Sequence, residues 1–356
     1  MDRAAASPLT AADIATALAP LAGRRRLLLA VSGGPDSACL LHMLARWRRD
    51  HPGVALEAAT VDHGLRQASA DEAAAVAAWC GRLGLPHATL RWTGLKPRSG
   101  LQAAAREARY ALLAAHARAA GADVLLTAHH ADDQAETVLM RLAHGSGLRG
   151  LAGMAPLARR PGGLLHARPL LHLPKARLVA TLAAWGEPSF EDPSNADPRH
   201  GRSRARALAP LLAREGLSPG RLLRLAERAR RAEEALDALA REAFARHACR
   251  DGAGTSLAPG LFDEAPEIVI RVLLEALGGR ADQEIPALRL ARVEALAVAL
   301  AEARAEGRAL RRTIAGQVMS LDRHARVTIR AEKSRRRGRG AAGAGAAFIA
   351  RQGASC

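Results

Sequence analysis

Cysteine is scarce in this sequence and gives no sign of a disulfide or metal framework. The 356 residues include four cysteines, no two of which form a C-x-x-C pair: Cys39, Cys80, Cys249 and Cys356. No His-rich spacing stands beside them, as a zinc site would require. We therefore expect isolated, reduced thiols and neither a disulfide, a zinc site nor an iron–sulfur site.

Long apolar segments and aromatic residues are also lacking. No apolar run reaches the roughly 18 residues that span a bilayer, and the N-terminal region has no uninterrupted apolar core ahead of a cleavage site. We therefore predict a cytoplasmic protein without a membrane partner. Aromatic residues make up only 3% of the chain, which argues against the broad base-stacking surface of single-strand binders.

Acidic residues are outnumbered, and the net charge of +17 favours a polyanionic partner such as nucleic acid. Residues 1–198 hold 22 Lys and Arg against 17 Asp and Glu, whereas residues 199–356 hold 30 against 18. A basic surface is therefore expected mainly in the second half of the chain. The alternative is a compositional drift toward Arg and Ala, since nearly all of the cations are Arg.

The first 200 residues alternate between short apolar runs and helical periodicity. The apolar runs predict strands at residues 27–31, 54–61, 87–92 and 123–128. The segments that follow them have helical patterns, at residues 37–48, 71–83, 101–120 and 132–143. Repeating strand–helix units of this length predict an α/β fold: a doubly wound, Rossmann-like parallel sheet with helices on both faces.

The remainder of the chain changes character near residue 201. Its first part is strongly helical, its middle combines two helices with a hairpin-like alternation, and its end is basic and then rich in Gly and Ala. We predict a sheet domain (1–201), a helical linker (202–250), a small C-terminal α+β module (251–331) and a disordered tail (332–356).

A glycine-rich turn joins the first predicted strand to the first predicted helix. Two consecutive glycines permit positive φ angles and let a ligand approach the backbone closely. Consecutive N–H groups, two serine hydroxyls and the helix dipole suit a polyphosphate. No lysine follows, so this is not the G-x-x-x-x-G-K-[ST] loop. The candidate nucleotide-binding residues are Ser32, Gly33, Gly34, Pro35, Asp36 and Ser37.

Two further polar clusters follow predicted strands, at the edge of the sheet where such folds bind ligands. Asp62 and His63 follow the second strand, which places them well for a nucleotide. A longer cluster follows the fourth strand, where Asp133 and Glu136 share one helix face. These carboxylates suit an ammonium group, with the loop imidazole of His129 near the phosphates. Three alternatives stay open: acids that complement the helix dipole, plain loop residues, and a divalent metal site.

The motifs resemble one known family, in the same order along the chain. Residues 32–37 resemble the Ser-Gly-Gly-x-Asp-Ser loop of the N-type PP-loop ATP pyrophosphatases, which cleave ATP between the α and β phosphates. Residues 62–66 and the His-His-x-x-Asp-Gln-x-Glu-Thr run at 129–137 resemble the tRNA(Ile)-lysidine synthases. So do residues 145–151 and 192–195, followed by Arg202, Arg204 and Arg206.

The resemblance covers about residues 27–206 and implies an ATP-dependent ligase that modifies the wobble cytidine of the isoleucine tRNA with anticodon CAU. In that family the C2 oxygen of the cytosine attacks the α-phosphate of ATP and pyrophosphate leaves. The side-chain amine of free L-lysine then attacks C2 and expels AMP. The resulting lysidine pairs with A, which changes the codon specificity from AUG to AUA. The basic second half would contact the tRNA backbone.

The resemblance also implies roles at the nucleotide. The loop would hold ATP, and Asp36 would act in catalysis by helping to place a Mg²⁺ ion that offsets charge on the leaving pyrophosphate. Asp62, His63 and His129 would lie near the nucleotide.

At the second substrate, Asp133 and Glu136 would hold the lysine and point its amine at the activated base. Two arginines would steady phosphate or substrate charge as it develops. We assign them to Arg109 and Arg202, while the sequence leaves Arg106, Arg204 and Arg206 open as alternatives.

Other functions stay open from the sequence. A PP-loop tRNA thiolase, or another AMP-forming tRNA-modifying enzyme, shares the loop and the AMP step, but thiolases need paired cysteines. A ligase for small molecules, as in amidotransferases and NAD synthetase, would leave the basic half without a role. An RNA-binding module without catalysis would bind ATP and tRNA but release no pyrophosphate. The oligomeric state is not readable from the sequence, and a homodimer stays open.

Overall fold

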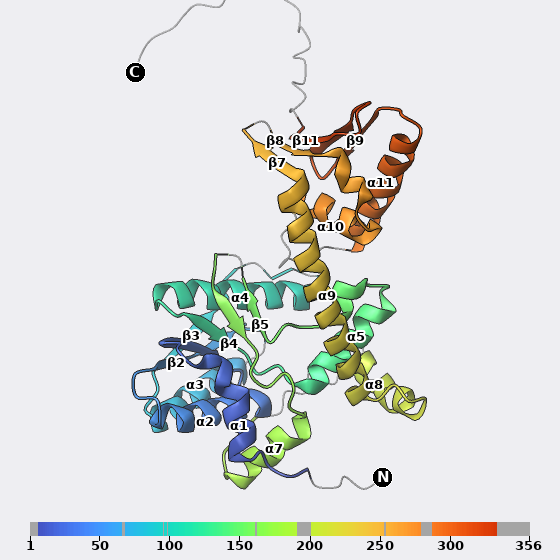
Figure 1. Ribbon diagram of the computed structural model, residues 1–356. Coiled ribbons are helices and arrows are strands. Elements are labelled where there is room, and N and C mark those ends of the chain that lie inside the picture. Colours follow the sequence, from blue (N-terminus) through green and yellow to red (C-terminus); the bar gives the residue numbers. More distant parts are fainter. Residues whose placement is uncertain are drawn as a thin grey trace, which may run out of the picture. The chain divides into compact units, whose positions relative to one another are not determined.

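The computed structural model describes residues 6–65, 68–94, 96–97, 99–160, 162–190, 201–252, 254–278 and 287–332. They fall into two compact units (Figure 1). The first unit comprises the described residues up to Leu239 together with 287–290, and the second comprises those from Ala240 to 278 and from Ala291 onward. The division lies inside one long helix, α9 (Pro219–His247). The boundaries expected from the sequence stay a prediction, and the tail from residue 333 onward lies outside the described residues.

A six-stranded, mostly parallel sheet forms the centre of the first unit. Its strand order is β3-β2-β1-β4-β6-β5, and only β5 runs antiparallel, against β6. The strands are β1 (Arg26–Ala30), β2 (Ala55–Asp62), β3 (His87–Arg91), β4 (Val124–Leu126), β5 (Leu157–Arg159) and β6 (Leu165–Ala167). The chain builds outward from β1 to β3 on one side and then returns to place β4 on the other side of β1. The α/β sheet expected from the periodicity is confirmed.

Helices cover both faces of this sheet because alternate side chains of each strand point to opposite faces. On β1, Leu27 and Leu29 belong to one buried cluster and Leu28 to another. The first cluster takes in α1 (Ala11–Leu18), α2 (Pro35–Arg49), α3 (Ala68–Arg82) and α7 (Lys175–Ala184). The second cluster takes in α4 (Leu101–Ala119). Shorter elements are a 3-10 turn at Ala19–Leu21 and α6 (Leu148–Leu151).

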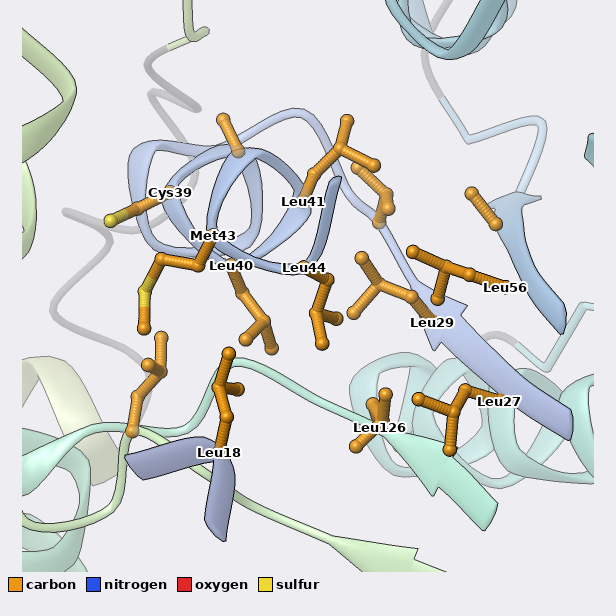
Figure 2. Close-up of a cluster of buried hydrophobic side chains, with 14 of the residues drawn as sticks. Leu18, Leu27, Leu29, Cys39, Leu40, Leu41, Met43, Leu44, Leu56 and Leu126 are labelled. Atoms are coloured by element: carbon orange, nitrogen blue, oxygen red, sulfur yellow. The ribbon is translucent and has the colours of Figure 1, made fainter. Parts of the chain in front are cut away.

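The larger core lies between α2 and the sheet. Figure 2 shows Leu40 and Leu44 of α2 on the side of the helix that faces Leu29 of β1 and Leu126 of β4. All four side chains are fully buried, and burying one leucine contributes about 1.5–3 kcal/mol. This packing fixes the start of α2 at the end of β1.

Three helices extend the first unit beyond the sheet. They are α5 (Ala131–Ala143), α8 (Gly201–Arg214) and the beginning of α9. Val138 of α5 packs with Leu222 and Ala226 of α9 in a small buried cluster. α8 lies against α5 as well, so the helix that follows β4 has two helical neighbours.

The second unit is built on a five-stranded antiparallel sheet of order β7-β8-β11-β10-β9. Its strands are β7 (Ala248–Asp251), β8 (Gly254–Leu257), β9 (Leu310–Ile314), β10 (Gln317–Leu321) and β11 (Val327–Ala331). Its helices are a 3-10 turn at Pro259–Asp263, α10 (Pro266–Ala276) and most of α11 (Ala287–Ala305). Leu257, Val272 and Val327 are among its fully buried residues. A small α+β module was expected here, although β7 and β8 were missed.

No helix in the described part of the chain combines the length and apolarity needed to cross a bilayer.

Candidate active site

The polar motifs lie at the carboxyl ends of β1, β2 and β4. The strand order reverses between β1 and β4, because β2 and β3 lie on one side of β1 and β4 to β6 on the other. In open α/β sheets, ligands bind outside the carboxyl ends of the strands at this reversal. The loop 32–37 follows β1, and His129 and His130 follow β4.

Gly33 is required by the shape of the loop after β1. Its φ is +83°, and an added Cβ would lie 2.8 Å from Cδ2 of Phe190. The carbonyl of Gly33 accepts a hydrogen bond of 2.8 Å from the Phe190 N–H, and the Phe190 ring stacks on Trp79 at 5.0 Å. A side chain at this position would both strain the backbone and displace the aromatic pair.

The first turn of α2 is open to an anion. Its N-cap, Gly34, has no side chain to bond the helix N–H groups, and Pro35 opens the first turn. The Ser37 hydroxyl donates to the Gly34 carbonyl at 3.0 Å and accepts from the Ser32 N–H at 3.2 Å. The remaining first-turn amides and the positive end of the helix dipole suit a phosphate group.

Asp36 lies in that first turn and faces two cations. Its Oδ2 lies 3.5 Å from Nε2 of His130 and 3.6 Å from Nζ of Lys175. Its Oδ1 is buried and has no hydrogen-bond partner among the described residues. A buried carboxylate oxygen without a partner is costly, and such an oxygen is a ligand that Mg²⁺ prefers.

His130 connects the starts of α2 and α5. Burial lowers the pKa of this ring, but hydrogen bonds to the carboxylates of Asp132 and Asp36 outweigh that and raise the pKa to about 9. Asp132 also accepts from the Lys175 N–H at 2.8 Å, and its hydrogen bond to His130 helps to lower its pKa to about 2. The sequence reasoning placed His130 in the motif but did not single it out, nor did it find Lys175.

Asp133 and Glu136 lie on one face of α5, as their spacing predicts, and both face arginines of α8. Oδ1 of Asp133 lies 3.9 Å from Nη1 of Arg202 and 3.8 Å from Nη2 of Arg206. Glu136 accepts hydrogen bonds from Nε and Nη2 of Arg206. Burial raises the pKa of Glu136, and the Arg206 pair opposes that shift. Of the open arginines, the structure therefore brings both Arg202 and Arg206 to the acidic pair.

A cavity of about 110 Å³ adjoins this pair inside the first unit. Its walls are mainly apolar and come from α5, α8 and the beginning of α9, with Leu139, Leu212 and Leu222 among them. Glu136 and Arg206 supply charged groups at its wall. The cavity suits a short aliphatic chain that carries a cation at one end.

Asp62, His63 and Arg109 form a second group, at the end of β2. Asp62 accepts from the Gly64 N–H at 2.8 Å and from the Ser69 hydroxyl at 2.7 Å, and these bonds lower its pKa. Nε2 of His63 accepts from Arg109 at 3.1 Å, while burial and the Arg109 charge lower the pKa of His63. Asp62 therefore holds the loop in place, and Arg109 points its charge at His63.

His129 is half-buried and neutral. Its Nδ1 lies 2.8 Å from the hydroxyl of Thr127. Burial, and then the charges of Arg168 and Arg202, hold the pKa of His129 well below its usual value. Arg202, one of the charges that lower this pKa, also faces Asp133.

The fold and the loop at the reversal point define a class of protein. A family model described as a PP-loop domain matches residues 8–212, which is more than half of the chain. Among solved structures, U34-tRNA thiolase NcsA from Methanococcus maripaludis has a similar fold, with a TM-score of 0.53 and 20% identity. That likeness covers 61% of this chain and 77% of the other.

Within that class, the chain belongs to the tRNA(Ile)-lysidine synthase family. It is 50% identical over 342 residues to the tRNA(Ile)-lysidine synthase of Methylobacterium sp. strain 4-46, which covers 94% of this chain and 98% of the relative. It is 47% identical over 350 residues to that of Bradyrhizobium sp. strain BTAi1, covering 93% and 97%. The similarity thus extends through both units.

Proposed function

We propose that this chain is an ATP-dependent ligase that forms lysidine at the wobble cytidine of the isoleucine tRNA with anticodon CAU. One observation carries the proposal: the uncapped start of α2 with Asp36 lies beside the acidic pair of α5, in a chain half identical to lysidine synthases over nearly its whole length. The first feature suits ATP and the second suits the ammonium group of lysine.

The first step is adenylation of the cytosine C2 oxygen. The amides of the loop 32–37 bind the triphosphate, and the glycine backbone lets it approach closely. The unpartnered Oδ1 of Asp36 fits a Mg²⁺ ion, which when bound offsets negative charge on the pyrophosphate. His129 and the group of Asp62 and His63 line the nucleotide.

Arginines stabilise the charge that develops on the phosphate. Arg202 lies 3.9 Å from Asp133, and its charge helps to lower the pKa of His129. Arg109 approaches the second group through His63. Fixed cations that face the reacting phosphate lower the barrier without reorganisation. Arg206 shares this position with Arg202 in the structure, so it joins the catalytic candidates.

The second step is the attack of the lysine amine on C2. Asp133 and Glu136 bind the ammonium end of the approaching amino acid, and the apolar cavity beside Glu136 accommodates aliphatic carbons. In the structure Arg206 is hydrogen-bonded to Glu136. The ammonium group of lysine therefore takes the place of the Arg206 guanidinium at this carboxylate. The amine must lose a proton before it attacks, and the buried Glu136, whose pKa is raised, is suited to accept it.

Sulfur transfer, the main alternative, is less supported. Cys39 and Cys80 are buried, and burial raises the pKa of their thiols to about 12 and about 11. A thiol with a raised pKa is a poor nucleophile and a poor cluster ligand at neutral pH. We therefore favour lysine over sulfur as the group transferred, and we place the reaction in the cytoplasm. A homodimer stays a prediction that light scattering would test.

The direct test is incubation with ATP, radiolabelled L-lysine and a transcribed isoleucine tRNA that bears the CAU anticodon. We expect label on the anticodon loop, with one AMP and one pyrophosphate released for each lysine joined. A methionine tRNA with the same anticodon is the matched control and should acquire little label. Sulfur transfer to the tRNA without lysine transfer would favour the thiolase instead.

The variant Asp36→Asn tests the proposed role of the loop in pyrophosphate release. Asp50 is exposed and lies at the opposite end of α2, so Asp50→Asn is the matched control. The first variant should stop pyrophosphate release while remaining folded, and the second should not affect it. Normal turnover by Asp36→Asn would contradict the role given to the loop.

A further inference from the structure

Three polar side chains behind the site form a continuous hydrogen-bonded chain. His166 lies on β6 and is fully buried. Its Nε2 lies 2.8 Å from the hydroxyl of Thr127, which follows β4, and that hydroxyl lies 2.8 Å from Nδ1 of His129. The chain thus runs from inside the sheet to the edge where the nucleotide is proposed to bind.

Two arginines determine the direction of every bond in this chain. Nε of Arg160 lies 3.2 Å, and Nη2 of Arg168 3.1 Å, from Nδ1 of His166. A guanidinium group can only donate, so Nδ1 of His166 must accept and its proton must be on Nε2. That proton is donated to the Thr127 oxygen.

The hydroxyl of Thr127 then has one proton left to give. Its oxygen could accept from both rings, but the described residues offer the buried O–H no other acceptor, and leaving it unpaired would be costly. The hydroxyl therefore donates to Nδ1 of His129, which carries a lone pair there. A neutral imidazole has one N–H, so the proton of His129 is on Nε2. The two arginines therefore fix the tautomer of His129 through His166 and Thr127.

The surrounding charges exclude the doubly protonated rings. Burial and the charges of Arg168 and Arg160 lower the pKa of His166 to about 2. Burial and Arg168 also hold the pKa of His129 well below its usual value. The Tyr110 ring lies against the same cluster, with the guanidinium carbon of Arg160 3.7 Å from its centre, which keeps that arginine in place.

We propose that His166 and Thr127 are positioning residues that hold His129 as its Nε2–H tautomer, so that it presents a hydrogen-bond donor to the phosphate oxygens of ATP. The opposite tautomer would turn a lone pair toward those oxygens and repel them. A neutral donor gives a directed bond without competing for the carboxylates of the lysine site. This inference rests on the proposed function, because it assumes that ATP binds at this edge.

The tautomer can be measured directly by nitrogen NMR of the full chain labelled with ¹⁵N-histidine, with His129→Gln used to assign the signals. We expect a single Nε2–H form of His129 from pH 6 to pH 8. Thr127→Val should abolish that preference, and Thr127→Ser, which keeps the hydroxyl, should restore it. A His129 that carries its proton on Nδ1, or a Thr127→Val protein with the same tautomer as the wild type, would overturn the proposal.

The consequence for the ligand is measured by calorimetric titration with Mg-ATP alone. Loss of a hydrogen bond to a charged group predicts that Thr127→Val binds ATP roughly tenfold more weakly, while Thr127→Ser stays close to wild type. Thr181→Val is the matched control, since Thr181 is another buried threonine with hydrogen bonds, to Leu9 and Arg177, outside the proposed site. It should lose stability without changing ATP affinity.

Equal ATP affinity of Thr127→Val and wild type would also overturn the proposal. Neither readout requires turnover, so a failure of this proposal can be distinguished from a failure of the proposed ligase function. If only the ligase function were wrong, the tautomer and the ATP affinities would behave as expected, but labelled lysine would not reach the tRNA.

Discussion

Acid should destabilise the first unit through His166. The pKa of this ring is lowered to about 2 in the folded protein, whereas an unfolded chain gives a histidine pKa of about 6.5. Below pH 6.5 the His166 ring is therefore protonated in the unfolded state but not in the folded state. The free energy of unfolding should fall as the pH falls through this window, with a slope that approaches about 1.36 kcal/mol per pH unit.

Between pH 7.5 and pH 4.5 this slope amounts to about 2–3 kcal/mol from His166 alone. Solvent does not screen the charge on this ring, because the His166 side chain is fully buried. Other groups also titrate in this range, including His129, whose pKa is shifted in the same direction. Their contribution is largely shared by the wild type and a His166→Gln variant, so the difference between the two proteins isolates His166.

Urea unfolding followed by tryptophan fluorescence is the suitable assay, because all four tryptophans belong to the first unit: Trp47, Trp79, Trp92 and Trp185. Wild type should lose about 2–3 kcal/mol more than His166→Gln between pH 7.5 and pH 4.5. The exposed His51→Gln should follow the wild type. Equal losses in wild type and His166→Gln would refute the reasoning, since they would mean that the arginine cluster admits a proton on His166.

Three further outcomes follow from the site. Gly33→Ala should cost about 1–2 kcal/mol in urea unfolding, because of its positive φ and the approach to Phe190; unchanged stability would contradict the loop geometry. Glu136→Gln should raise the KM for lysine roughly tenfold or more while pyrophosphate release persists, and the exposed Glu107→Gln should not. The affinity for tRNA should fall steeply with salt concentration, and a flat dependence would argue against a phosphate-contacting basic surface.

The local part of the site could be predicted from sequence because it is written in adjacent residues. The apolar run before Ser32, the two glycines and the periodicity of α2 together require a strand, a sharp turn and a helix. The facing of Asp133 and Glu136 follows from helical spacing alone. Each of these inferences needs only the geometry of a single element.

The contacts between elements could not be predicted in this way. His130 meets Asp36 because β4 is placed beside β1, and periodicity does not encode strand order. His166 was missed because β6 has only three residues in a turn-rich segment. The choice among the arginines of α8 depends on how that helix packs on α5, and the structure brings two of them to the acidic pair instead of one.

Helix-dipole complementarity, an alternative that the sequence left open for the acids of α5, explains some of them and not others. Asp132 and Asp133 lie in the first turn, where a negative charge is favourable whatever the protein does. Glu136 lies beyond the first turn, where the dipole effect has largely decayed. It is buried, and burial raises its pKa while the hydrogen bonds from Arg206 oppose that shift, so the helix dipole does not account for its position. A buried carboxylate beside an apolar cavity and hydrogen-bonded to Arg206 is consistent with the proposed binding of the lysine ammonium group, for which the helix dipole alone gives no reason.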